Sequence, residues 1–169
     1  DIKQKNTVML VFSLIFYAWG EPVYILLLVG MTLTDWYLTL IMSKYENGSI
    51  KAKLFLGLTI SVDLVLLGIF KYGSFILSNI KFFTGFPAKV PSIMLPIGIS
   101  FYTFQLITYC VDVYRGDVRP QRSFKTLLLY VSLFHQCIAG PIVRYKDICA
   151  ELEERRASQF DIAEGINRF

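Results

Sequence analysis

The sequence is short of charge. Only 18% of its 169 residues are charged, against roughly a quarter in an average soluble domain, whereas 54% are hydrophobic and the mean hydropathy is +0.52. The net charge is only +4, and the basic residues lie in short clusters between apolar runs rather than on one face, which argues against nucleic acid as a partner. This composition indicates a membrane protein, with membrane lipid as its surroundings.

Cysteine is also scarce and forms no motif. Cys110, Cys137 and Cys149 show no CxxC or Cys/His spacing, so we expect no metal site. We interpret Cys110 and Cys137, which lie in apolar runs, as small hydrophobic residues. The chain further lacks an initiator Met, the residue order of a signal peptide and a helix stop signal in its last stretch, "FDIAEGINRF". We therefore expect it to be a piece of a longer protein.

What the sequence does contain is a series of apolar runs, together with ten Tyr, fourteen Phe and two Trp that suit the headgroup level. We expect an all-α fold, a partial polytopic transmembrane bundle of about four to five membrane segments with an amphipathic C-terminal tail. The predicted segments of this single membrane-embedded domain, 1–169, cover residues 7–19, 23–42, 54–77, 95–113 and 126–143, and residues 144–169 are predicted to be interfacial.

Turn residues separate these runs. Gly20-Glu21-Pro22 divides the first two, and the stretch from Ser78 to Ser92 is predicted to be a loop. Pro96 suits the first turn of the next helix, where its missing N–H costs nothing, and Gly116 suits the end of that helix.

The basic connectors indicate a topology. Residues 44–53 and 115–125 are the clearest basic loops and are separated by two predicted crossings, so both fall on the same side. The positive-inside bias makes that side cytoplasmic and places residues 78–92 outside.

One face of the helix predicted over 96–113 is polar. By i, i+3, i+4 spacing this face comprises Gly98, Phe101, Tyr102, Gln105, Thr108, Tyr109 and Asp112. An unpaired amide in hydrocarbon is costly, so the face must meet protein or water. It either lines a cavity or bonds a neighbouring helix.

The last apolar run carries a second polar face, formed by Ser132, His135, Gln136 and Gly140. Gly140-Pro141 is predicted to break the helix at membrane depth, which is tolerated where protein or water satisfies the freed backbone groups. Arg144 either snorkels to the interface or reaches inward to an anionic ligand.

Ionisable residues inside the runs are candidate site residues. Asp63 lies in the middle of a predicted span, where an acid has a functional role, is neutral, or pairs with a residue outside this chain. Asp35 and Asp112 are predicted to lie nearer span ends, within reach of solvent or an ion pair. His135 has Ser132 one turn away but no acid on its face, so we interpret it as structural rather than as a catalytic base.

Four stretches carry a resemblance to a known family. They are "FYAWGEP" (Phe16–Pro22), "VDLVLLGIFKYGSF" (Val62–Phe75), "LPIGISFYTFQLITYCVDVYRGD" (Leu95–Asp117) and "IAGPIVRYKDI" (Ile138–Ile148). Together they resemble the membrane-bound O-acyltransferases, in particular the bacterial branch of alginate O-acetyltransferases and D-alanyl transferases. The resemblance covers nearly the whole chain but only the N-terminal part of the family's length.

This resemblance implies a multi-pass enzyme of the bacterial cytoplasmic membrane that moves an acyl group, typically acetyl, to a hydroxyl of an extracytoplasmic glycan. It implies no bound cofactor, because the thioester donor, acetyl coenzyme A or an acyl-carrier protein, is a co-substrate. Accessory acetylation proteins are expected partners. The family's catalytic histidine is expected beyond Phe169, and His135 occupies a position that is commonly proline in relatives. We therefore expect no catalytic residue in this chain and no activity from it alone.

Two other functions fit the sequence. A transporter or channel segment would use Asp63 and the polar faces as its pathway, and a catalytically silent scaffold would keep the fold without the base.

Overall fold

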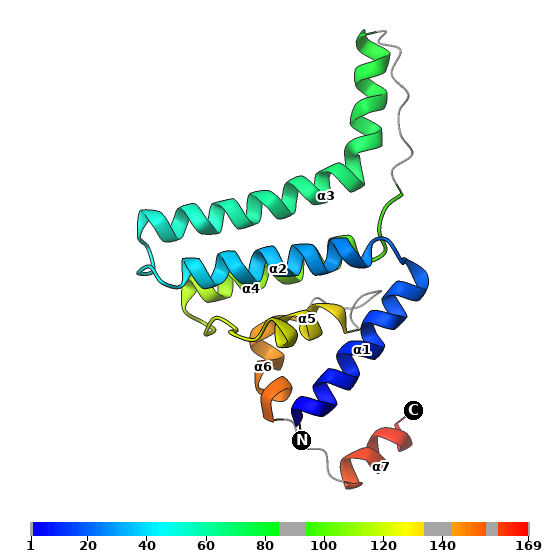
Figure 1. The fold of residues 1–169 in the computed structure, drawn as a ribbon, viewed down its shortest axis with the longest axis vertical. Coiled ribbons are helices and arrows are strands. Elements are labelled where there is room, and N and C mark those ends of the chain that lie inside the picture. Colours follow the sequence, from blue (N-terminus) through cyan, green and yellow to red (C-terminus); the bar gives the residue numbers. More distant parts are fainter. Residues whose placement is uncertain (1, 85–93, 134–142, 155–158, 169) are drawn as a thin grey trace.

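The computed structural model describes residues 2–84, 94–133, 143–154 and 159–168. Within these ranges all regular structure is helical, which confirms the all-α prediction (Figure 1). The helices are α1 (Ile2–Gly20), α2 (Ile25–Met42), α3 (Ile50–Thr84), α4 (Ile99–Arg115), α5 (Phe124–Ser132), α6 (Tyr145–Glu154) and α7 (Gln159–Asn167).

The centre of the bundle is formed by α2, α3 and α4, each of which packs on the other two, and α5 packs on α1 and α2 (Figure 1). The buried residues of α2 recur every three or four positions, as a helix with one protein-facing side requires. They are Leu28, Met31, Thr32, Asp35, Thr39 and Met42.

By length and composition, α2 and α3 are each able to cross a bilayer. Over an 18-residue window, the mean hydropathy is 1.8 in Ile25–Met42 and 2.0 within Ile50–Thr84. Eighteen helical residues rise about 27 Å, close to the thickness of a hydrocarbon core. Within the described residues, these are the two helices long and apolar enough to span a membrane. The expected total of about four to five membrane segments remains a prediction.

The third helix is longer than predicted. α3 runs for 35 residues from Ile50 to Thr84, so the predicted loop from Ser78 is wrong over 78–84. The polar side chains there bond the helix itself: the Ser78 hydroxyl donates to the Ser74 carbonyl at 2.7 Å and the Asn79 amide to the Phe75 carbonyl at 2.9 Å. Figure 1 shows α3 bending in its second half, where Gly73-Ser74 supplies a pair that commonly permits a kink.

The start of α4 also differs from the prediction. Pro96 precedes the helix, because Gly98 adopts a left-handed conformation with φ of 75° and the helix begins at Ile99. The predicted end is confirmed: Gly116 has φ of 81°, and its N–H bonds the last turn of α4.

The last predicted span is not one helix. Ser123 caps α5, but the helix ends at Ser132, and Leu133 has φ of −54° and ψ of 115°. The Tyr130 hydroxyl donates to the Val143 carbonyl at 2.8 Å, whereas a continuous helix would place these residues about 20 Å apart. Residues 126–143 are therefore wrong as a single helix, and the expected break at Gly140-Pro141 lies outside the described residues.

The predicted interfacial tail contributes to the bundle. α6 packs on α1, α4 and α5, and buries Tyr145 and Leu152. How residues 144–169 lie relative to the membrane remains a prediction.

Candidate functional site

Two of the stretches that carried the family resemblance meet at the turn between α1 and α2. The hydroxyl of Tyr17 donates to the Ile97 carbonyl at 3.0 Å, and the hydroxyl of Tyr24 donates to the Met94 carbonyl at 3.0 Å. Glu21 accepts a hydrogen bond from the Ile97 N–H at 3.3 Å. The irregular backbone at 94–97 is thus satisfied by Tyr17 and Glu21 of the "FYAWGEP" stretch and by Tyr24 just after it.

A second polar centre forms around Gln121 in the connector between α4 and α5. Its backbone N–H donates to the Tyr109 hydroxyl at 2.9 Å, and its carbonyl accepts from the Trp36 indole at 3.0 Å. Its side-chain amide donates to the Tyr145 hydroxyl at 2.8 Å and accepts from the Ser123 N–H at 2.9 Å. Gln121 therefore joins α2, α4, α6 and the start of α5.

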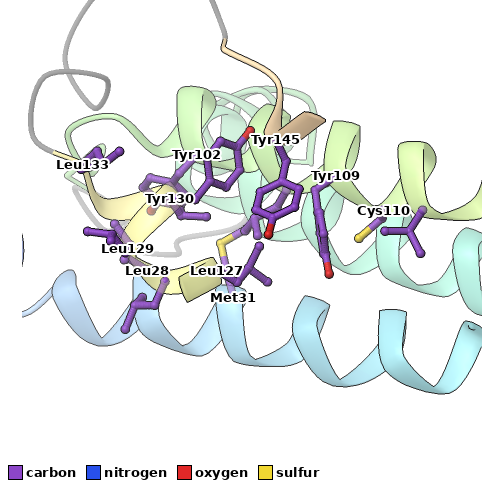
Figure 2. Close-up of a cluster of buried hydrophobic side chains, with 14 of the residues drawn as sticks. Leu28, Met31, Tyr102, Tyr109, Cys110, Leu127, Leu129, Tyr130, Leu133 and Tyr145 are labelled. Carbon is purple, nitrogen blue, oxygen red and sulfur yellow. The ribbon is translucent and has the colours of Figure 1, made fainter. Parts of the chain in front are cut away.

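Aromatic rings surround this centre. The ring of Tyr145 lies edge-on to Tyr109 and Tyr130, with centroid distances of 5.1 and 5.2 Å. Figure 2 shows these rings above Leu127 and Met31 in the buried cluster. Tyr145 belongs to the "IAGPIVRYKDI" stretch and Tyr109 to the "LPIGISFYTFQ" stretch, so these two stretches also meet.

The polar face predicted on α4 is turned into the protein. Tyr102, Gln105, Tyr109 and Asp112 are all buried, while Phe101 is partly exposed. Of these residues, Tyr109 bonds protein: its hydroxyl accepts from the Gln121 N–H in the connector after α4.

The other predicted site residues are dispersed. Ser132 is buried at the end of α5, whereas Arg144 is exposed just before α6. His135 and Gln136 lie outside the described residues. The structure therefore does not bring the predicted set together at one point.

The residue that sequence reasoning missed is Asp35. The sequence placed Asp35 near a span end, within reach of solvent or an ion pair. This prediction is wrong, because Asp35 is fully buried on α2 and faces Asp63 of α3. Asp63 is itself fully buried, so neither carboxyl group lines an open pathway in the described structure. The sequence did contain a signal for this residue: Asp35 is the one charged residue between Glu21 and Lys44, in the middle of an apolar run.

An open cleft lies where the starts of α1 and α5 approach the end of α6. Its volume is about 530 Å³, and its lining includes Lys3, Asn6, Ser123, Lys125 and Thr126. The Asn6 side chain donates to the Leu152 carbonyl at 2.7 Å, which fixes α6 beside α1. Two lysines and a capped helix start give this cleft a positive potential suited to anionic groups.

Comparison with curated proteins gives relatives along nearly the whole chain. A probable alginate O-acetylase of Pseudomonas aeruginosa is 36% identical over 171 residues, covering 99% of this chain and 33% of the relative. Over nearly its whole length the chain is therefore similar to members of the membrane-bound O-acyltransferase family. A probable alginate O-acetylase of Azotobacter vinelandii is 34% identical, covering 99% of the chain and 34% of the relative. A peptidoglycan O-acetyltransferase of Helicobacter pylori is 30% identical, covering 85% and 32%.

These O-acyltransferase relatives are much longer than the chain, which spans about a third of their length. No family model and no solved structure matches it. Similarity to these membrane-associated acetyltransferases agrees with the two described helices that are long and apolar enough to cross a bilayer.

Proposed function

We propose that the full-length protein transfers an acyl group, most simply acetyl, from a thioester donor to a hydroxyl of an extracytoplasmic polysaccharide. It does so as a multi-pass protein of the bacterial cytoplasmic membrane. The observation that carries this proposal is the 36% identity to a probable alginate O-acetylase over 99% of the chain. The named acceptors of the relatives, alginate and peptidoglycan, are both polysaccharides.

The chemistry assigns a supporting role to this part of the protein. Transfer breaks the acyl C–S bond, forms a C–O ester bond and moves the hydroxyl proton to the departing thiol, so a positioned base is needed. The resemblance implies that this base is a histidine beyond Phe169. The described helices supply the frame: the two polar centres at residues 94–97 and at Gln121 fix the stretches that carry the family resemblance against each other.

The cleft beside Lys3 and Lys125 is the proposed approach for the donor. It lies at the end of the bundle that the basic connectors predict to be cytoplasmic. Acetyl coenzyme A and the phosphopantetheine of an acyl-carrier protein both carry phosphate, which the lysines would attract. The donor is a co-substrate in this proposal, and no bound cofactor is needed. Accessory acetylation proteins would complete the transfer to the polymer outside.

The test is removal of the gene followed by measurement of ester-linked acetate on envelope polysaccharides. We expect the ester to disappear and to return with the full-length gene. Unchanged ester content would contradict the proposed function.

The donor is tested with purified full-length protein and labelled acetyl coenzyme A or acetyl-carrier protein. We expect Lys125→Ala to raise KM for the donor, while Lys53→Ala, an exposed lysine on α3, leaves it unchanged. Equal KM values for the two variants would remove the cleft from the proposal without touching the reaction. A need for added accessory proteins would show as donor use without polymer acetylation.

A further inference from the structure

Asp35 and Asp63 face each other in the middle of the α2–α3 pair. Two aromatic contacts fix the register of these helices: Tyr45 stacks on Phe55 and Tyr24 meets Phe70 edge-on, both with centroids 5.8 Å apart. The two aspartates lie between these contacts on the antiparallel helices. Each residue has 0% exposure, and the packing of α2 on α3 in this register turns the two carboxyl groups toward each other.

No donor from the described residues reaches these carboxyl groups. If both groups were carboxylates, all four of their oxygen atoms would be buried without a hydrogen-bond donor. Two carboxylates offer only acceptor atoms, so a hydrogen bond between them requires a proton on one. One proton on either carboxyl group would therefore supply the missing donor.

Among the residues that the structure describes, every Lys and Arg side chain is exposed, so none compensates the buried pair. From α4, the Cys110 thiol faces α2, 3.0 Å from the Thr39 hydroxyl. The other buried titratable groups of α4 are the Tyr102 and Tyr109 phenols and the carboxyl group of Asp112. On α2 and α3 the lysines lie elsewhere: Lys44 follows α2, and those of α3, including Lys71, are exposed. α5 buries apolar residues, Tyr130 and Ser132, and its Lys125 is exposed.

The pair is already closed within this third of the protein. α2, α3 and α4 pack on one another and leave both aspartates fully buried within the chain itself. A divalent metal would need more ligands than two carboxylates, and the described residues contain no group of three His, Cys, Asp or Glu side chains able to hold one.

We propose that Asp35 and Asp63 form a proton-binding site, in which one proton is held between the two carboxyl groups and joins α2 to α3. The ligand is a proton because it is the one cation that converts an acceptor pair into a donor–acceptor pair without further ligands. The tests of this site are structural and do not require acyl-transfer activity.

The first test is infrared spectroscopy of the full-length protein in detergent. We expect a carboxylic-acid C=O band in the difference spectrum between wild type and Asp35→Asn, and again for Asp63→Asn, shifting in heavy water. Asp117→Asn, in the exposed connector after α4, is the matched control and gives no such band. Difference spectra for both buried positions without an acid band would overturn the proposal.

The second test separates a proton from a sodium ion. An asparagine amide can donate to the remaining carboxylate, so each single variant is expected to fold and to melt within a few degrees of wild type. By mass action, the melting temperature of wild type should fall more steeply with rising pH than that of Asp35→Asn/Asp63→Asn. The same pH dependence in both proteins overturns the proposal, and so does a wild-type melting temperature that rises with added Na⁺ but not in the double variant.

Discussion

At the scale of single residues, the structure is held together by side chains that bond backbone groups far away in the sequence. Tyr17 reaches Ile97 and Trp36 reaches Gln121, both in stretches without regular structure. An unpaired backbone group buried in an apolar medium costs several kcal/mol, so each such bond permits a helix to stop inside the bundle. Irregular connections are therefore the positions where side-chain identity matters most.

The first prediction concerns Gln121, whose side chain both donates to Tyr145 and accepts from the Ser123 N–H. Gln121→Ala removes these two hydrogen bonds while keeping the two made by its backbone. We expect a loss of about 1–3 kcal/mol in the free energy of unfolding, because each bond contributes about 0.5–1.5 kcal/mol.

The measurement is thermal unfolding of the full-length protein in detergent. Arg122→Ala is the control, since that side chain is exposed one position along the same connector. A Gln121→Ala protein as stable as the Arg122→Ala protein would contradict the role of this residue as a joining point.

At the scale of elements, the sequence predicted the helices that composition alone determines. α2 was predictable because its apolar run lies between Gly20-Glu21-Pro22 and a basic turn, and the end of α4 was predictable from Gly116. The end of α5 at Ser132 was not, because the apolar run continues and the cause is the distant bond from Tyr130 to Val143. The contact between Asp35 and Asp63 also depends on helix register, which no local pattern records.

The second prediction concerns Gly116, which ends α4. A Cβ built on this glycine would lie 3.3 Å from Nδ2 of Asn47, and its φ of 81° is unfavourable for any residue with a side chain. We expect Gly116→Ala to lower the free energy of unfolding by about 1–2 kcal/mol.

Gly57→Ala on α3 is the matched control, because a Cβ there meets nothing within 4 Å and the backbone is helical. Alanine in a helix is favoured over glycine by about 0.5–1 kcal/mol, so this variant should be at least as stable as wild type. The two melting temperatures should therefore move in different directions, and a common shift would contradict the strain assigned to Gly116.

At the scale of the whole molecule, the two basic connections lie at the same end of the bundle. Figure 1 shows the α2–α3 and α4–α5 connections together, with the α1–α2 turn at the opposite end. The close approach of Asn47 to Gly116 joins these two connections directly. This arrangement agrees with the sequence prediction that both lie on one side of the membrane, and the positive-inside bias predicts that this side is cytoplasmic.

The last prediction follows from this geometry and is tested by cysteine labelling in cells that express the full-length protein without its native cysteines. Asn47→Cys and Arg119→Cys, both exposed, should react with a membrane-impermeant maleimide only after the cells are opened, because both connections are predicted to face the cytoplasm. Val23→Cys, exposed at the opposite end, should react in intact cells. Labelling of positions 47 and 119 from different sides would contradict the structure, since their connections are in contact. Labelling of both in intact cells would instead keep the packing and reverse the orientation, which would also move the proposed donor cleft to the wrong side for a cytoplasmic thioester.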